Sequence, residues 1–225
     1  MVMVAVQDRI HEAALRLYAE RSTPKVTVSE LAEAAGVARG TVYHHVGDID
    51  ALFEDVAERL VAEMDAQIAE VFPPTPWDDP ALRIAGGIRF YIRRAQENPV
   101  WGRFLARYGA STPTLRAVLT GRARTDLLRG IELGRFQVRP DQIPSAIAAL
   151  TGGVIAAISL VLDGYATWRD AGADTAELYL NALGVPADVA QSLVRNELPN
   201  PPPVTGRSKR RPSPPRGPGD DADVR

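Results

Sequence analysis

The segment VSELAEAAGVARGTVYHHV, residues 28–46, decides the fold of this chain. Thr27 stands just before it and Glu30 follows three residues later, a capping-box pattern that predicts the start of a short helix. Gly36 then supplies the left-handed conformation that ends a helix tightly. A second short helix is predicted over about residues 38–46. Two short helices joined by a glycine turn form a helix-turn-helix.

The residues from Gly40 to His45 indicate what this helix pair does. A helix-turn-helix serves DNA by placing its second helix in the major groove while the first braces against the backbone. Leu31, Ala32 and Val42 are core residues under any interpretation. The sequence GTVYHH favours DNA binding over a merely packed helix, so we predict a DNA-binding function.

Helical periodicity continues on both sides of the motif. An amphipathic helix is predicted over residues 7–21, and we expect Asp48 to cap a helix that reaches about residue 71. Prolines exclude a helix over residues 72–80. Further helices are predicted over about residues 81–97, 100–108, 113–133, 141–162, 175–183 and 187–197.

No segment shows the sustained two-residue alternation of a strand, so the predicted fold class is all-α. We expect an N-terminal three-helix unit over residues 1–50 and a larger helical domain over residues 51–198. Residues 199–225 are rich in Pro, Gly, Ser and Arg and are predicted to be disordered. Basic residues in this tail could attract DNA weakly, although a solubilising tail is the interpretation we favour. They are Arg207, Lys209, Arg210, Arg211 and Arg216.

Composition narrows the classes of function. Of 225 residues, 45% are apolar and 24% are charged, as in ordinary soluble globular proteins. The chain has no Cys and three His, so disulfides and Cys-ligated zinc are excluded and neither a metal nor a cofactor is expected. The N-terminal sequence MVMVAVQDRI lacks the features of a secretory signal, so we expect a cytoplasmic protein.

The net charge of -2 conceals an uneven distribution. Residues 83–139 contain twelve Arg and three acidic residues, whereas residues 1–60 contain six basic and ten acidic residues. A DNA-binding prediction must therefore rest on particular residues and not on bulk charge. The central arginines suggest an anionic or acyl-thioester ligand, but solvated helix faces explain most of them equally well.

Over about residues 10–60 the sequence resembles the TetR family of bacterial transcriptional regulators. The resemblance is carried by AAGV at residues 34–37 and GTVYHHV at residues 40–46, and the order of the downstream helices also fits. It implies a ligand-responsive regulator, most often a repressor, that binds a palindromic DNA operator as a homodimer and is released by a small-molecule inducer. The domain over residues 51–198 would then bind the ligand and dimerise, and no membrane partner is expected.

The resemblance also implies which residues contact DNA. Arg39, Thr41 and His45 stand where the family's recognition helix reaches base edges, and Arg39 is the best candidate for a bidentate guanine contact. Gly40 lies in the recognition helix beside Arg39. The resemblance implies phosphate contacts for three other residues. Those three are Thr27, Tyr43 and His44.

Two residues depart from the family's pattern. Ala38 stands where Ser or Thr usually caps the recognition helix, and Ile49 replaces a Lys that often meets the DNA backbone. Both departures predict modest affinity, or affinity gained from other contacts.

The uncharged run over residues 143–162 is about long enough to span a bilayer. Polar residues dilute it, no aromatic belt flanks it and no second span exists, so we favour a buried helix. Its small residues allow close approach to the same helix of a second subunit. They are Ala148, Gly152, Gly153, Ala156 and Ala157. In the family, this helix and the one predicted over residues 175–183 would form a four-helix dimer bundle.

An aromatic stripe on the helix over residues 100–108 has two interpretations. It is either simple apolar core or, as the resemblance suggests, part of a ligand cavity among the central helices. The candidate ligand-binding residues are Phe90, Trp101, Phe104, Leu105, Tyr108 and Ile155.

Two rival classes of function remain. An enzyme is not expected, because the sequence has no paired-carboxylate motif, no Gly-rich phosphate loop and no Cys nucleophile. An interaction module without DNA binding would leave the GTVYHH block unexplained. An activator in place of a repressor stays open.

Overall fold

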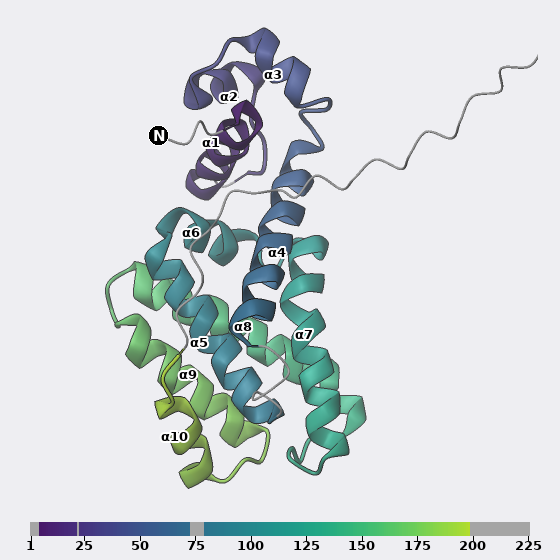
Figure 1. The fold of residues 1–225 in the computed structure, drawn as a ribbon, viewed down its shortest axis with the longest axis vertical. Helices are drawn as coiled ribbons and strands as arrows, with labels where there is room; N and C mark the ends of the chain where they lie inside the picture. Colours follow the sequence, from purple (N-terminus) through teal and green to yellow (C-terminus); the bar gives the residue numbers. More distant parts are fainter. Residues whose placement is uncertain (1–4, 22, 73–78, 199–225) are drawn as a thin grey trace, which may run out of the picture.

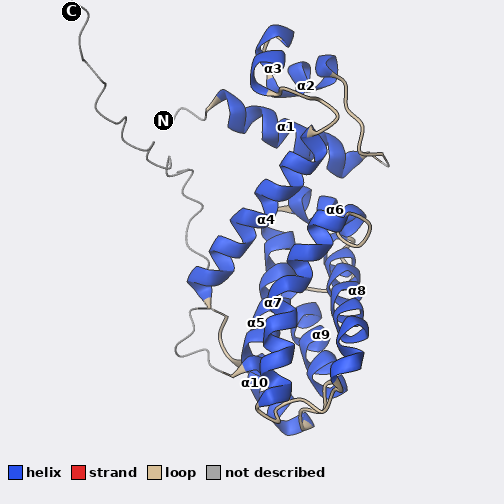
Figure 2. Ribbon diagram, turned by 90° about the vertical axis from the view of Figure 1, so that its right-hand side faces the viewer, coloured by secondary structure: helices blue, strands red, loops and turns tan. Residues whose placement is uncertain are grey.

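The computed structural model describes residues 5–21, 23–72 and 79–198, and this part of the chain is helical without strands (Figures 1 and 2). The predicted all-α fold is thus confirmed. The helices are α1 (Val6–Glu20), α2 (Val28–Ala35), α3 (Arg39–His45), α4 (Leu52–Val71), α5 (Pro80–Glu97), α6 (Pro99–Tyr108), α7 (Pro113–Glu132), the 3₁₀ helix η1 (Pro140–Gln142), α8 (Ile143–Leu162), α9 (Trp168–Ala182) and α10 (Ala187–Arg195). The predicted tail over residues 199–225 lies outside the described residues.

Two hydrophobic cores hold the molecule together, and α4 contributes to both. Its first half packs Leu52, Phe53 and Val56 into the core of α1, α2 and α3. Its second half packs Met64 and Ile68 into a larger core with α5 and α7 to α10. As Figure 1 shows, α4 runs from the upper unit down into the lower helical body. It is therefore a continuous link between the two cores.

The lower body is arranged around α5, which contacts α6, α7, α8, α9 and α10. At Gly86 on this helix, a Cβ atom would lie 2.5 Å from the ring of Phe72, the residue that ends α4. A glycine is needed here because the end of α4 packs directly on the backbone of α5. This contact places the end of α4 deep in the lower core, where Phe72 is buried.

Residues 140–162 are long and apolar enough to cross a membrane by length and composition alone. In the fold, α8 packs one face against α5, α6 and α9, so the helix that was predicted to be buried is buried on that face only. Its other face is exposed.

Two predicted helix starts are wrong. Asp48 does not cap α4, because its Oδ1 accepts from the backbone N–H of Asp50 at 2.9 Å in a local turn, and the helix starts only at Leu52. The last long helix, α9, starts at Trp168 and not near residue 175. Thr167 caps it there, since its Oγ1 accepts from the N–H of Asp170 at 3.2 Å.

Candidate DNA-binding surface and internal cavity

The helix-turn-helix forms as its local signals predict. Thr27 Oγ1 accepts from the N–H of Glu30 at 3.3 Å, and the N–H of Thr27 donates to Glu30 Oε2 at 2.8 Å. This reciprocal pair is a complete capping box at the start of α2. Gly36 has a φ of 63° at the end of α2, in the left-handed region.

An ion pair reinforces the capping box. Arg21, just after α1, approaches Glu30 Oε1 to 2.6 Å. The hydrogen bond from Arg21, together with those from Thr27, lowers the pKa of Glu30 to about 2. Glu30 therefore stays ionised over the whole physiological pH range and ties α1 to α2.

Two arginines on α1 hold the other end of α2. Nη2 of Arg9 donates to the carbonyl oxygens of Ala35 and Gly36, at 2.7 Å each. Nη2 of Arg16 donates to the carbonyl oxygen of Ala34 at 3.2 Å. Both cations lie at a helix C-terminus, where carbonyl groups lack helical partners and the helix dipole is negative.

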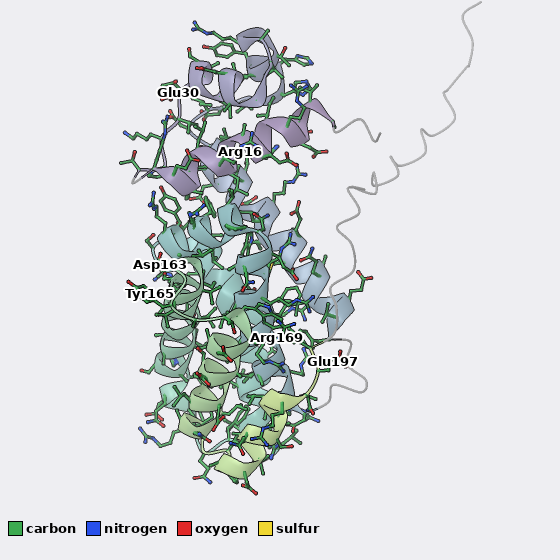
Figure 3. The ribbon with its side chains drawn as sticks, turned by 90° about the vertical axis from the view of Figure 1, so that its left-hand side faces the viewer. Arg16, Glu30, Asp163, Tyr165, Arg169 and Glu197 are labelled. Carbon is green, nitrogen blue, oxygen red and sulfur yellow. The ribbon has the colours of Figure 1, made fainter. Side chains whose placement is uncertain are left out.

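Sequence reasoning missed this pair of arginines. The available signal was their spacing of seven residues, which places both on one side of α1. Figure 3 shows Arg16 and Glu30 within the same upper unit. Because α2 is fixed at both ends, the turn at Gly36 holds α3 in a defined orientation.

The second helix of the motif presents most of the predicted DNA-contacting side chains to solvent. Val42 is fully buried and anchors α3, whereas Tyr43 is 69% exposed. No side chain caps the start of α3, as the departure at Ala38 predicts. Four more residues of the predicted set are exposed, and Thr41 is half-buried. The four are Arg39, Gly40, His44 and His45.

The remaining member of the predicted set, Thr27, lies at the start of α2. Its hydroxyl accepts from the N–H of Glu30 and donates to Glu30 Oε2 at 2.7 Å. This side chain is therefore already engaged within the protein, although the residue is exposed.

An aromatic cluster joins the helix-turn-helix unit to the lower body. Tyr18 of α1 and Phe53 of α4 meet Phe104 and Tyr108 of α6, with ring centroids between 5.0 and 6.4 Å apart. The hydroxyl of Tyr108 donates to the carbonyl oxygen of Arg21 at 2.9 Å. Burial raises the pKa of Tyr18 to about 12. The cluster thus links α6 directly to α1.

A second contact between the units is an ion pair. Arg59 of α4 approaches Asp8 of α1 to 2.6 Å and Glu63 of its own helix to 3.1 Å. All three side chains are partly solvent-exposed, so each pair contributes little by itself. The aromatic cluster is the stronger junction because it is buried.

A cavity of about 730 Å³, its opening to solvent included, lies between α4, α5, α7 and α8. Leu105 and Ile155 of the predicted ligand-binding set line it. Trp101 and Phe104 border a smaller void of about 290 Å³, together with Leu105. Phe90 is buried in the core beside Phe72, and Tyr108 lies in the aromatic cluster. The larger cavity therefore brings together two of the six predicted residues.

The cavity wall has a polar side that sequence reasoning missed. Nε of Arg83 on α5 donates to Oδ1 of Asp126 on α7 at 2.7 Å. Burial raises the pKa of Asp126, although the hydrogen bond from Arg83 opposes this effect. Thr151 of α8 also lines the cavity, and its buried Oγ1 has no hydrogen-bond partner among the described residues. No sequence motif marks these three residues, because only tertiary packing brings them together.

The small residues predicted at a subunit interface lie on different sides of α8. Ala148, Gly152 and Ala156 are exposed, and Gly153 is half-buried. Ala157 is 3% exposed and packs inside the protomer, so it does not share this surface. Three large apolar side chains are exposed nearby on α8, α9 and their connection, and Figure 3 shows Tyr165 at the edge of the body. The three are Leu160, Tyr165 and Leu178.

Two family models match the chain. One, described as "Bacterial regulatory proteins, tetR family", matches residues 10–56. The other, described as "Tetracyclin repressor-like, C-terminal domain", matches residues 79–196, more than half of the chain. The first match covers the helix-turn-helix, and the second covers α5 to α10.

Curated relatives include bacterial regulators. An uncharacterised HTH-type transcriptional regulator of Mycobacterium tuberculosis is 29% identical over 120 residues, which are 52% of this chain and 55% of the relative. The HTH-type transcriptional repressor AcnR of Corynebacterium glutamicum is 38% identical over 64 residues, 28% of this chain and 34% of AcnR. The chain spans about half the length, or less, of the curated relatives it matches.

Solved structures match over more of the chain. RolR in complex with its ligand resorcinol is 32% identical with a TM-score of 0.67, covering 88% of this chain and 96% of RolR. A tetR-family regulator from Shewanella sp. PV-4 is 21% identical with a TM-score of 0.66, covering 80% of this chain and 98% of the other. The second likeness concerns the fold alone.

Proposed function

We propose a function from one premise: the chain belongs to the tetR family of bacterial regulatory proteins. It is a transcriptional regulator with a DNA-binding helix-turn-helix, in a family of regulators and not of enzymes. Beyond this, we propose that it is a cytoplasmic repressor that binds a palindromic operator as a homodimer and is released by a small-molecule effector.

The exposed surface of α3 carries this proposal. Tyr43 is 69% exposed, so its ring and hydroxyl are accessible to another molecule. It lies in α3 beside exposed Arg39 and His44, while α2 is fixed by the capping box and by Arg9 and Arg16. A rigid helix with exposed donors suits insertion into the major groove. Proposed DNA contacts are Thr27, Arg39, Gly40, Thr41, Tyr43, His44 and His45.

Homodimerisation is proposed through α8 and α9. The exposed stripe of Ala148, Gly152 and Ala156 lets a second copy of α8 approach closely. The exposed Leu160 and Leu178 add apolar area that a partner would cover. A dimer would present two α3 helices to two half-sites of the operator.

An effector is proposed to occupy the cavity between α4, α5, α7 and α8. RolR, the solved relative at 32% identity, binds resorcinol, which supports a small-molecule ligand for this chain. Ile68 and Phe72 of α4 line the cavity, and the same helix continues into the helix-turn-helix core. We therefore assign DNA binding to residues 1–50, effector binding and dimerisation to residues 51–198, and a solubilising role to residues 199–225.

An electrophoretic mobility shift with the DNA upstream of the protein's own coding sequence tests the proposal. We expect a shift that resists non-specific competitor DNA and weakens steeply with salt. An interaction protein without specific DNA binding would give no such shift, and that result would end the proposal. Deleting the gene should raise transcription from the same promoter. A fall in transcription would instead identify an activator.

A further inference from the structure

The polar wall of the internal cavity points to a chemical class of ligand. We infer that the effector is a neutral, ring-sized molecule bearing a hydroxyl group, recognised by Thr151, Asp126 and Arg83. The inference rests on the proposed function in one respect, that this cavity is the effector site.

The apolar side of the cavity indicates that most of the ligand is apolar. Ile84, Ile88 and Val154 present aliphatic surface, and Phe72 and Tyr91 present aromatic rings. Pockets lined in this way bind mainly apolar molecules, and a few polar groups then fix their orientation. A small aromatic ring fits within this space and matches its lining.

Thr151 gives the strongest indication that the ligand in this cavity has a polar group. Its Oγ1 is buried and has no hydrogen-bond partner among the described residues, although the residue lines the cavity. A buried hydroxyl without a partner costs free energy, and a ligand group that bonds to it recovers that cost. Because a hydroxyl both donates and accepts, Thr151 by itself does not choose between ligand donors and acceptors.

The charged residues of the cavity wall favour a ligand group that both donates and accepts hydrogen bonds. Asp126 accepts one hydrogen bond, from Arg83 Nε to Oδ1, and its Oδ2 accepts none from the described residues. Arg122 adds a second guanidinium to the wall. A carboxylate can only accept and a guanidinium can only donate, so the wall offers both kinds of partner. A ligand hydroxyl can use both, whereas an anionic ligand would be repelled by Asp126, which lies beside both guanidinium groups.

The same wall touches the helix that leads to the DNA-binding unit. Nη1 of Arg83 lies 3.4 Å from the carbonyl oxygen of Phe72, which ends α4. A ligand that draws Asp126 or Arg83 toward itself therefore acts on the end of α4. Arg83 would therefore both recognise the ligand hydroxyl and transmit its binding to α4.

Isothermal titration of the full chain with four probes tests the inference. Resorcinol and phenol carry hydroxyls, toluene has the shape of phenol without its hydroxyl, and benzoate is anionic. We expect resorcinol and phenol to bind more tightly than toluene and benzoate. Thr151→Val, which keeps the shape of the side chain, should weaken resorcinol by about five- to tenfold and leave toluene unchanged or tighter.

Two further variants keep the result interpretable. Thr151→Ser should restore resorcinol binding, and Ser159→Ala on the same helix should leave it unchanged, because Ser159 bonds to the Ile155 carbonyl and does not line the cavity. Tightest binding of benzoate, no binding of any hydroxylated ring, or an unchanged affinity in Thr151→Val would each overturn the inference.

Operator binding by the unliganded protein, measured in parallel, separates this inference from the proposed function. A specific operator shift with no binding of hydroxylated rings overturns the inference and leaves the repressor proposal standing. Binding of hydroxylated rings without any specific shift supports the cavity assignment and overturns the repressor proposal.

Discussion

At the scale of single residues, arginines organise the DNA-binding unit in two different ways. The guanidinium groups of Arg9 and Arg16 donate hydrogen bonds to carbonyl oxygens at the end of α2. Arg39 makes no such contact among the described residues, and it is exposed on α3. The first two position α3, whereas the guanidinium group of Arg39 is available to contact a base.

Arg39→Ala should therefore reduce the sequence specificity of operator binding. We expect a loss of about 1–3 kcal/mol in operator binding and a relaxed preference at one base pair in each half-site. Tyr43→Phe, which removes a proposed phosphate contact, should weaken all sequences alike. Binding is measured against a palindromic operator and its point variants. An unchanged specificity profile in Arg39→Ala would remove this residue from the reading set.

Glu30 makes the stability of the helix-turn-helix depend on pH. The hydrogen bond from Arg21 and those from Thr27 hold its pKa at about 2, below the ordinary value of 4.5. A lowered folded-state pKa means that the stabilisation is fully present above about pH 4.5 and is lost as the pH falls toward 2. In Glu30→Gln, the difference in unfolding free energy from wild type should shrink across that window.

Urea denaturation followed by circular dichroism between pH 7 and pH 2.5 checks this prediction. Glu33→Gln is the matched control, because Glu33 lies on the same helix and forms no ion pair among the described residues. A Glu30→Gln deficit that stayed constant with pH would show that the charge of Glu30 does not matter.

At the scale of secondary structure, α8 has one face for the protomer and one for solvent. Ile147, Val154 and Ile158 are buried in the lower core, whereas Gly152 and Ala156 are exposed. A Cβ built at Gly152 meets no atom within 4 Å. A large side chain can therefore be placed there without disturbing the protomer.

Gly152→Leu should separate folding from assembly. We expect the protomer to stay folded, while the overpacked helix pair loses at least a few kcal/mol of dimer stability and operator binding fails with it. Gly121→Leu on α7 is the control, because a Cβ there also meets no atom within 4 Å. Light scattering reports the assembly state. A wild-type monomer that bound a palindrome tightly would contradict the dimer model.

The second element of interest is α6, which lies between the cavity and the DNA-binding unit. Leu105 lines the cavity, and Tyr108 one turn later donates to the carbonyl oxygen of Arg21 after α1. A ligand that displaces α6 would therefore act on α1 through this hydrogen bond, and on the first half of α4 through the contacts of Phe104 and Tyr108 with Phe53. The molecule thus has two mechanical routes from the cavity to the helix-turn-helix.

Tyr108→Phe removes only the hydroxyl from the second route. It should cost about 0.5–1.5 kcal/mol of stability and reduce the effect of the effector on operator affinity. Tyr165→Phe serves as control, because Tyr165 is 81% exposed. Equal effector responses in Tyr108→Phe and wild type would show that the hydrogen bond from Tyr108 to Arg21 takes no part in the coupling.

At the scale of the whole molecule, the proposed regulation would depend on the distance between the two α3 helices of the proposed dimer. Two half-sites are read together only if the α3 helices lie about one helical turn of DNA apart, or a multiple of it. The long α4, visible in Figure 1 as the link between upper and lower units, would set this distance in the proposed dimer, because it carries the helix-turn-helix of each protomer. In this proposal, a ligand in the lower unit would release DNA without contacting it.

This mechanism requires ligand and operator to weaken each other by the same factor. We expect an inducing ligand to bind operator-saturated protein more weakly than free protein, and by the factor by which it weakens operator binding. Titration of the ligand into both forms measures this. Equal ligand affinities, together with release of DNA at equilibrium, would rule out linkage through α4 or α6.

The sequence by itself determined the helix-turn-helix, because its signals are local. Thr27 and Glu30 satisfy each other within one helical turn, and Gly36 adopts its left-handed conformation through its own lack of a side chain. The all-α class and most helix bounds also follow from short-range periodicity. The start of α9 was missed because the Thr167 cap precedes a stretch with small residues and weak periodicity.

Only the tertiary structure decided the cavity and its polar wall. Arg83 and Asp126 are 43 residues apart, and no spacing rule brings them together. Helical periodicity showed that α6 has an apolar face, but it could not show which neighbours fill the space against that face. Phe104 and Tyr108 pack into an aromatic cluster with Tyr18 and Phe53, whereas Leu105 and Ile155 line the larger cavity, because the side chains that surround each of them come from other helices.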